Sequence, residues 1–203
     1  MTDCSYYGRM IKRSIDAVLL FCLHYLLGDM MLKIIHKMSG LRFSELMEVY
    51  QESNQLNAQE LYSFLDPDEQ LRNVHLDFYH YLNSVFFMQQ HSFYAIWEPD
   101  GRYAAALRME PYMDGMLLSA LETAPEARRK GYAVALIKSV LDYLNKHTNS
   151  KIYSHVSNRN IGSLRVHLKC GFEILKDIAV YSDGSVMRNH YTLVYTNKKS
   201  EIA

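Results

Sequence analysis

The hydrophobic pattern of the chain switches between two periods. Short runs in which apolar residues alternate with polar ones, or stand together between turn residues, predict β-strands. Apolar residues spaced three or four apart predict amphipathic helices. Strands are expected over residues 32–38, 92–97, 102–109, 116–123, 151–156, 172–181 and 191–195. Helices are expected over residues 43–55, 57–64, 66–88, 127–146 and 160–170.

Turn and cap residues separate these segments. Asp66-Pro67 is typical of a helix start, because Asp can cap the helix and Pro suits its first position. Pro99-Asp100-Gly101 predicts a hairpin turn between two of the strands. Hairpins give antiparallel strand pairs, and crossovers through helices give parallel ones. The order of elements therefore predicts an α/β fold with a mixed sheet.

The first 29 residues stand apart from this pattern. Basic residues precede an apolar run over residues 17–27, which is shorter than the about 20 residues of a membrane-spanning helix. The run contains a histidine and no clear cleavage site follows it, so a signal peptide is disfavoured. We expect residues 1–29 to be an added helix or a stretch ahead of the true start. Residues 30–197 are expected to form one domain, and 198–203 a frayed tail.

Composition limits the function classes. The chain has 203 residues, of which 49% are hydrophobic and 22% charged, as in an ordinary globular protein with a substantial core. Lys plus Arg and Asp plus Glu both number 22, so no overall charge attracts nucleic acid or an anionic membrane. The three cysteines are far apart and have no metal-ligand spacing. We expect a cytoplasmic protein without a metal, a membrane span or a nucleic-acid partner.

The most informative stretch is a basic turn that leads from a predicted strand into a long helix. It reads Arg128-Arg129-Lys130-Gly131-Tyr132-Ala133. A helix N-terminus offers unpaired N–H groups and a positive partial charge, and Gly131 lets a ligand approach the backbone closely. The basic side chains add charge where a diphosphate would lie. By itself the turn is also consistent with a solvated basic loop, and it lacks the P-loop and dinucleotide glycine patterns.

Two blocks of sequence resemble the GCN5-related N-acetyltransferase (GNAT) superfamily. The turn is similar to the family's Arg/Gln-x-x-Gly-x-Gly/Ala signature, and Thr123-Ala124-Pro125-Glu126 resembles the lead-in before it. Residues 160–172 resemble the helix Asn-x-x-Ser/Ala…Tyr-x-x-x-Gly-Phe. The order of elements over residues 31–195 agrees with the family. The resemblance implies a GNAT fold, with a mixed sheet of about six to seven strands flanked by helices and splayed central strands.

The resemblance also implies a site for acetyl-CoA as acyl donor, between the splayed strands at 116–123 and 151–156. The pantetheine arm is expected along the backbone of Leu121 to Thr123, where an N–H group would polarise the thioester carbonyl. The residues expected to bind the pyrophosphate through their N–H groups are Arg128, Arg129, Lys130, Gly131, Tyr132 and Ala133. Asn160 and Ser163 are expected to line the same site, and Asn160 also suits the N-cap of its helix.

Two residues are candidates for acid–base chemistry. His167 stands where the family usually has a Tyr that protonates the departing thiolate. Histidine can donate a proton near neutral pH, and a packing role is the alternative. The base that deprotonates the incoming ammonium group is expected to be Glu122, with Glu110 as the other well-placed carboxylate. Alternation alone does not tell which face of the strand looks into the acceptor cleft.

We therefore expect an acetyl-CoA-dependent N-acetyltransferase, acting as a monomer or homodimer. It would move an acetyl or short acyl group to the primary amine of a small molecule or peptide by direct attack. One alternative is a non-catalytic acyl-CoA-binding module, favoured by the missing Tyr at position 167. Another is an acyltransferase acting on a protein or a charged tRNA, and the neutral overall charge counts against tRNA.

Overall fold

The computed structural model describes residues 31–148 and 150–197. A compact unit of the chain begins at Leu32. The expectations for residues 1–29 and 198–203 concern residues outside the described part, and they stay predictions. Across the two described ranges, no helix has both the length and the apolar character needed to cross a bilayer.

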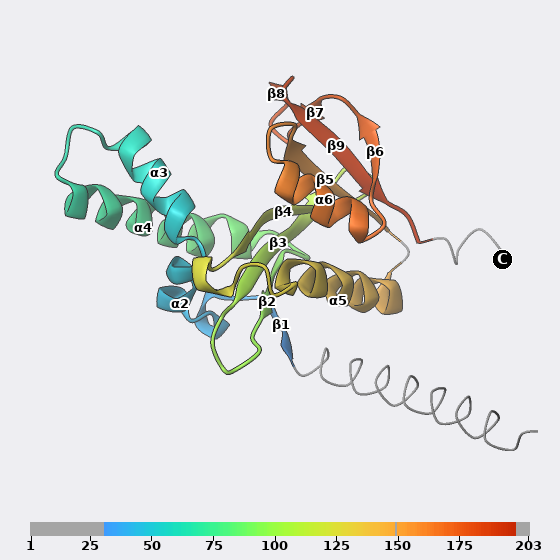
Figure 1. Ribbon diagram of the computed structural model, residues 1–203, viewed down its shortest axis with the longest axis horizontal. Helices are drawn as coiled ribbons and strands as arrows, with labels where there is room; N and C mark the ends of the chain where they lie inside the picture. Colours follow the sequence, from blue (N-terminus) through green and yellow to red (C-terminus); the bar gives the residue numbers. More distant parts are fainter. Residues whose placement is uncertain (1–30, 149, 198–203) are drawn as a thin grey trace, which may run out of the picture. The chain divides into compact units, whose positions relative to one another are not determined.

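The described residues form a seven-stranded mixed sheet and a separate two-stranded hairpin (Figure 1). The sheet order is β1-β2-β3-β4-β5-β9-β6. Its strands are β1 (Leu32–Ile35), β2 (Phe93–Trp97), β3 (Ala105–Tyr112), β4 (Gly115–Thr123), β5 (Lys151–Ser157), β9 (His190–Tyr195) and β6 (Glu173–Lys176). The hairpin consists of β7 (Ala179–Val180) and β8 (Val186–Met187). The prediction of a mixed sheet of six to seven strands flanked by helices is confirmed.

The helices follow the amphipathic segments of the sequence. They are α2 (Phe43–Val49), α3 (Gln51–Leu61), α4 (Pro67–Ser84), α5 (Tyr132–His147) and α6 (Ile161–Lys169), with 3-10 turns η1 (Met38–Gly40), η2 (Phe86–Met88) and η3 (Pro125–Ala127). Asp66 caps α4 as expected, because its carboxylate accepts the N–H groups of Asp68 and Glu69, each at 3.1 Å. Pro67 occupies the first turn, where no N–H is needed.

Strand pairing follows the connections. The hairpin-linked neighbours β2–β3 and β3–β4 are antiparallel. The pair β4–β5 is parallel, because the chain returns through α5 before the next strand. β9 then inserts between β5 and β6 and runs antiparallel to both.

The register divides the sheet into two faces. Opposite residues on neighbouring strands share a face, so one row runs through Phe93, Met109, Leu118 and Ser154. Phe93 contacts Tyr143 of α5, and Ser154 contacts α6, so these two helices cover that face (Figure 1). The neighbouring row, Tyr94, Arg108 and Ser119, lies on the opposite face, towards α2, α3 and α4. All residues of β2 are buried, as expected for a strand that is covered on both faces.

The first helical segment was predicted with the wrong boundaries. The sequence pattern predicts helices at 43–55 and 57–64, whereas the structure ends α2 at Val49 and runs α3 from Gln51 to Leu61. The break lies at Tyr50, which is 4% exposed and whose hydroxyl donates to the carbonyl of Ala120 at 2.6 Å. A contact between residues 70 apart in the sequence holds this bend, so no local breaker residue marks it.

Two other boundaries were also wrong. The predicted strand at 172–181 is divided into β6, in the main sheet, and β7, which pairs with β8. Thr192 donates to the carbonyl of Ile178 at 2.7 Å between these pieces, which fixes the bend. The predicted helix at 127–146 begins only at Tyr132. Arg129 and Gly131 have φ angles of 63° and 83°, which lie outside the right-handed helical region. The basic residues 128–130 therefore precede the helix.

Candidate active site

A β-bulge in β4 shapes the centre of the sheet. Arg108 lies opposite Ser119 and Ala106 lies opposite Glu122, so three steps along β4 match two along β3. The extra residue bends the strand, and Ala120 has a φ of 49°. The hydroxyl of Tyr50 holds the Ala120 carbonyl in this position. Because the bulge resets the alternation, Glu122 shares a face with Arg108.

The strands β4 and β5 separate just beyond this bulge. Their pairing ends at Leu118 and Ser154, whereas β4 continues to Thr123 and β5 to Ser157. The edge of β4 from Ser119 onwards therefore has no partner on β5. Backbone groups on this edge that neither β3 nor a side chain engages could pair with an extended ligand in the opening. This is the separation of the central strands that the resemblance to the GNAT superfamily implies.

The basic turn continues from the open end of β4. Gly131 is the N-cap of α5 at a φ of 83°, and no side chain caps the helix there. A Cβ added at Gly131 would meet no atom within 4 Å, so the space in front of the helix is open. The first turn of α5 carries no acidic residue. The first N–H groups of the helix are therefore available to an anion, and their dipole favours it.

The three basic side chains of the turn differ in their surroundings. Arg128 forms an ion pair with Glu52 of α3 at 2.8 Å, and its Nε donates to the Thr123 carbonyl at 3.3 Å. The hydrogen bond to Glu52 raises the pKa of Arg128 above its ordinary value. Arg128 thus ties α3 to the end of β4, and part of its charge is already matched. Arg129 and Lys130 are exposed beside it.

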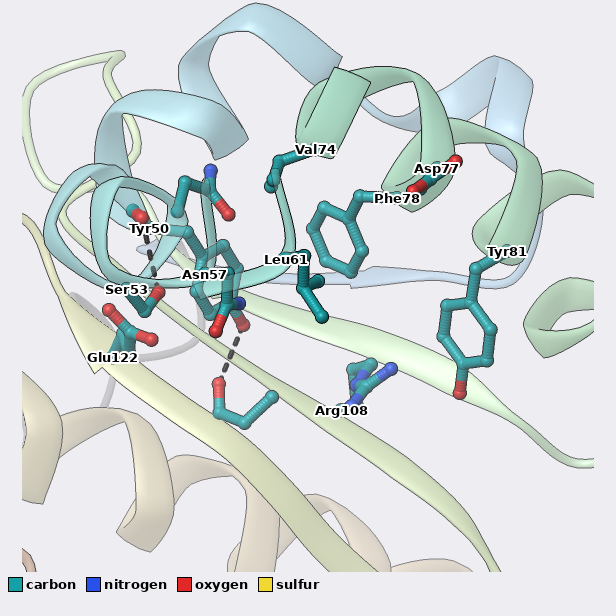
Figure 2. Close-up of a pocket in the computed structure, with 12 residues that line it drawn as sticks. Tyr50, Ser53, Asn57, Leu61, Val74, Asp77, Phe78, Tyr81, Arg108 and Glu122 are labelled. Atoms are coloured by element: carbon teal, nitrogen blue, oxygen red, sulfur yellow. Dashed lines mark hydrogen bonds between the residues drawn. The ribbon is translucent and has the colours of Figure 1, made fainter. Parts of the chain in front are cut away.

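A cavity of about 350 Å³ lies against β3 and β4, on the face opposite α5 and α6 (Figure 2). Its size is within the range of small-molecule sites. The residues that line it come from the break between α2 and α3, from α3 and α4, and from the two strands. They are Tyr50, Ser53, Asn54, Asn57, Leu61, Val74, Asp77, Phe78, Tyr81, Arg108, Ala120 and Glu122.

Glu122 lies in this cavity. The sequence pattern alone could not tell which face of the strand carries its side chain. Burial raises the pKa of its carboxyl above the ordinary value of 4.5, while a hydrogen bond from Ser53 and the charge of Arg128 lower it by less. A carboxylate with a raised pKa is a stronger base. Glu110, the other candidate carboxylate, does not line the cavity, and it accepts a hydrogen bond from Ser119 at 2.9 Å.

His167 is almost completely buried, at 1% exposure. Its Nδ1 lies 2.8 Å from the Ser163 carbonyl, which can only accept, so Nδ1 carries the proton. Its Nε2 lies 3.0 Å from the Ser154 hydroxyl, and in the neutral ring it accepts from that hydroxyl. Burial lowers the pKa of His167 below 6.5, and the hydrogen bond to Ser163 opposes this.

The start of α6 shows one of the two roles that were considered for Asn160. Its side chain accepts the Ser163 N–H at 3.0 Å, so Asn160 is the N-cap of the helix. Asn160 is exposed and Ser163 is half-buried. Their predicted contacts with a cofactor stay a prediction.

The two acid–base candidates lie on opposite faces of the sheet. His167 meets Ser154 on the face covered by α5 and α6, whereas Glu122 lies in the cavity on the other face. Both are beside the place where β4 and β5 separate. A thioester that passed through this opening would have one group on each side of it.

Three residues of this region carried no signal in the sequence. Arg108 and Tyr50 line the cavity, but both read as ordinary members of a strand and a helix. His155 follows Ser154, the last residue of β5 that pairs with β4. Its ring lies between those of Tyr112 and Tyr181, at centroid distances of 5.3 and 4.8 Å. Both its ring nitrogens are buried without a hydrogen-bond partner, and burial lowers its pKa. Because side chains alternate along a strand, the sequence could have predicted that His155 lies on the same face as Tyr153. It could not have predicted the contact between His155 and Tyr181.

Cysteine and metal chemistry have little support near these residues. Burial raises the pKa of Cys170 to about 11, so its thiol is not a nucleophile near neutral pH. In the part of the chain that the structure describes, no three His, Cys, Asp or Glu side chains are grouped as they would be around a metal ion.

Comparison with known proteins places these features in context. The model of the acetyltransferase (GNAT) family matches residues 43–172. No curated protein matches the sequence.

Solved structures share the fold at low sequence identity. PaiA N-acetyltransferase from Thermoplasma acidophilum, in complex with coenzyme A, has a TM-score of 0.54 at 11% identity, covering 82% of this chain and 99% of that one. Spermidine N-acetyltransferase from Vibrio cholerae, in complex with CoA and spermine, has a TM-score of 0.54 at 18% identity, covering 83% and 97%. IAA acetyltransferase from Bacillus cereus has a TM-score of 0.52 at 16% identity, covering 82% and 98%.

Proposed function

Because the chain belongs to the acetyltransferase (GNAT) family, we propose that it transfers an acetyl or other short acyl group from acetyl-CoA to a primary amine. The acceptor would be a small molecule or a peptide. One observation carries the proposal. At the open end of β4, an unpaired strand edge, an uncapped helix start and a carboxylate with a raised pKa come together.

The donor side of the site uses backbone groups. The pantetheine arm would pair with the free edge of β4 at Leu121 and Thr123, and the pyrophosphate would bind at the start of α5. The open space at Gly131 supports this placement, because phosphate oxygens need close approach to N–H groups. The amides of residues 128–133 would hold the diphosphate, with Arg129 and Lys130 adding charge. Asn160 and Ser163 would line the other side of the opening.

The acceptor side supplies the base. Glu122 would take a proton from the ammonium group, and the resulting amine would attack the thioester carbonyl carbon. A C–N bond forms, the C–S bond breaks, and the nitrogen loses its second proton as the amide forms. CoA leaves as a thiolate that takes up one proton, so one proton is released overall. A backbone N–H near Thr123 would stabilise the negative charge on the carbonyl oxygen. The raised pKa of Cys170 supports direct attack over a cysteine-bound intermediate.

The acid that protonates the thiolate is proposed to be the imidazolium form of His167, donating from Nε2, because the Nδ1 proton is already donated to the Ser163 carbonyl. Its neutral state and the hydrogen bond that it accepts from Ser154 also suit a second role, in which it positions β5. The lowered pKa is the one observation that favours a non-catalytic acyl-CoA-binding module as the alternative function, since it disfavours the acid form.

Acetyl-CoA binding and amine acetylation are tested separately. Acetyl-CoA at 100 times its Kd should stabilise the protein by about 2.7 kcal/mol, which raises the Tm of a domain of this size by roughly 5–10 °C. Release of free CoA thiol with a panel of amines, amino acids and peptides should then identify acceptors. No shift in Tm at millimolar acetyl-CoA would exclude both the enzyme and the binding module. A shift without thiol release from any amine would favour the module.

His167 predicts a pH dependence of stability. Its pKa is lower in the folded protein than the ordinary 6.5, so the unfolded chain binds the proton first as the pH falls. Stability is therefore full above about pH 6.5 and is lost as the pH falls towards the folded-state pKa. Replacing His167 by Phe should reduce this loss in urea unfolding curves between pH 7.5 and 5. Replacing the exposed His80 by Phe is the control, and equal losses in both variants would contradict the assignment.

A further inference from the structure

We propose that the cavity beside Glu122 takes acceptors that carry a carboxylate as well as the amine, and that Arg108 binds this carboxylate. The inference rests on the proposed acetyl transfer and specifies the class of acceptor. Figure 2 shows Arg108 in the lower middle of the cavity, with Glu122 on one side and Tyr81 on the other.

Arg108 is held in place by aromatic rings. Its Cζ lies 5.1 Å from the ring centroid of Tyr81 and 5.7 Å from that of Phe86. These contacts attract the cation and fix the plane of the guanidinium group. Tyr81 also forms a side-chain hydrogen bond with Arg108, whereas the buried Nε–H has no partner. The stem of the side chain comes from the middle of β3, beside the bulge. The guanidinium group is thus positioned before any ligand arrives.

Arg108 has a charge without an ion-pair partner among the described residues. Its Nε is buried and has no hydrogen-bond partner. Glu110, two residues along β3, influences its charge at longer range, but that carboxylate accepts from Ser119 instead. Burying a guanidinium group without an anion is costly, and a bound carboxylate would remove this cost. Carboxylates also match the fork of guanidinium N–H donors.

The other walls of the cavity limit the rest of the acceptor. Glu122 lies on the same face of the sheet and would attract the ammonium group. Leu61, Val74 and Phe78 supply an apolar wall. The three surfaces together fit a molecule with an amine, a carboxylate and an apolar or aromatic part, as in a hydrophobic amino acid. A polyamine fits less well, because a second ammonium group would face Arg108.

Matched acceptors test the proposal. Phenylalanine, phenylalaninamide and phenethylamine share a ring and an amine, but only phenylalanine has a carboxylate. We expect kcat/KM for phenylalanine, measured as CoA thiol release, to exceed that for the other two by roughly 10- to 100-fold. Arg108→Gln should abolish most of this preference by slowing phenylalanine alone. Arg108→Lys should keep a part of it, because the charge remains without the fork. Comparing ratios between variants cancels the intrinsic reactivities of the amines.

A binding experiment separates this inference from the proposed function. The Tm shift that each compound causes in the presence of CoA can be measured without turnover. Phenylalanine should give the largest shift in the wild-type protein. In Arg108→Gln, the three compounds should give similar shifts. Arg102→Gln is the control, because Arg102 is exposed, pairs with Glu48 and lies outside the cavity. If none of the three compounds is acetylated while the binding preference holds, the carboxylate site is supported and acetyl transfer to these three amines is overturned.

Two outcomes overturn the carboxylate site itself. One is an unchanged ratio of phenylalanine to phenethylamine in Arg108→Gln. The other is a wild-type protein that prefers phenethylamine or phenylalaninamide in both experiments, where a preference for the amide would indicate a peptide N-terminus as acceptor. If Arg108→Gln fails to fold by circular dichroism, the wild-type ratios and Arg108→Lys decide the question.

Discussion

Replacing Glu122 by Gln should lower kcat/KM for the amine by about 100- to 10,000-fold, which is the usual contribution of a general base. Gln keeps the shape of the side chain and a hydrogen-bond acceptor for Ser53, but it cannot take the proton. Because acetyl-CoA would bind to the backbone of β4 and α5, the KM for acetyl-CoA should be unchanged. Steady-state kinetics with each substrate varied in turn measure both effects.

The pH profile adds a second measure of Glu122. The base must be ionised to act, so wild-type kcat/KM should fall as the pH drops through the pKa of Glu122, which burial raises above 4.5. This limb should be absent from the residual activity of Glu122→Gln. Glu110→Gln is the matched control, since Glu110 is on the same face of the sheet but outside the cavity. A loss of activity in Glu110→Gln with normal activity in Glu122→Gln would show that the base was assigned to the wrong carboxylate.

Replacing Gly131 by Asp should weaken acetyl-CoA binding on the order of 100-fold. The new carboxylate would stand at the N-cap of α5, where it accepts the N–H groups proposed for the pyrophosphate and repels its charge. The backbone also becomes strained, because Gly131 has a φ of 83°. Isothermal titration with acetyl-CoA measures the loss of affinity directly.

Gly101 provides a control with the same backbone feature. It has a φ of 73°, and an added Cβ there would also meet no atom within 4 Å. It lies in the loop between β2 and β3, and it is not part of the turn that begins α5. Gly101→Asp should therefore cost similar stability and leave the Kd for acetyl-CoA unchanged. If both variants bind acetyl-CoA like the wild-type protein, the start of α5 is not the diphosphate site.

The predictions for Glu122→Gln and Gly131→Asp are independent, because the two residues belong to different parts of the site. Gly131 belongs to the donor side, at the start of a helix that packs on one face of the sheet. Glu122 belongs to the cavity on the other face. The separated strands β4 and β5 connect the two. One variant should therefore change the affinity for acetyl-CoA alone, and the other the rate with the amine.

The sequence by itself determined the features that depend on neighbouring residues. The order of elements along the chain follows from hydrophobic periodicity, and the structure has that order. The caps at Asp66 and Asn160 follow from local hydrogen bonding, and they are where they were expected. The basic turn at 128–133 was recognised from its residue types alone, and its role as the diphosphate site stays a prediction. Its exact helix start was missed, since φ angles above zero at Arg129 cannot be read from an arginine.

Only the tertiary structure decided what the acceptor side looks like. The bulge at Ala120 resets the alternation of β4, and it is held by Tyr50, 70 residues away in the sequence. That contact divides the first predicted helix and puts Glu122 on the same face as Arg108. The burial of His167 against Ser154 likewise depends on how α6 packs on β5. Periodicity describes one element at a time, whereas an acceptor cavity is formed by side chains from several elements, and their register is fixed only when the elements pack together.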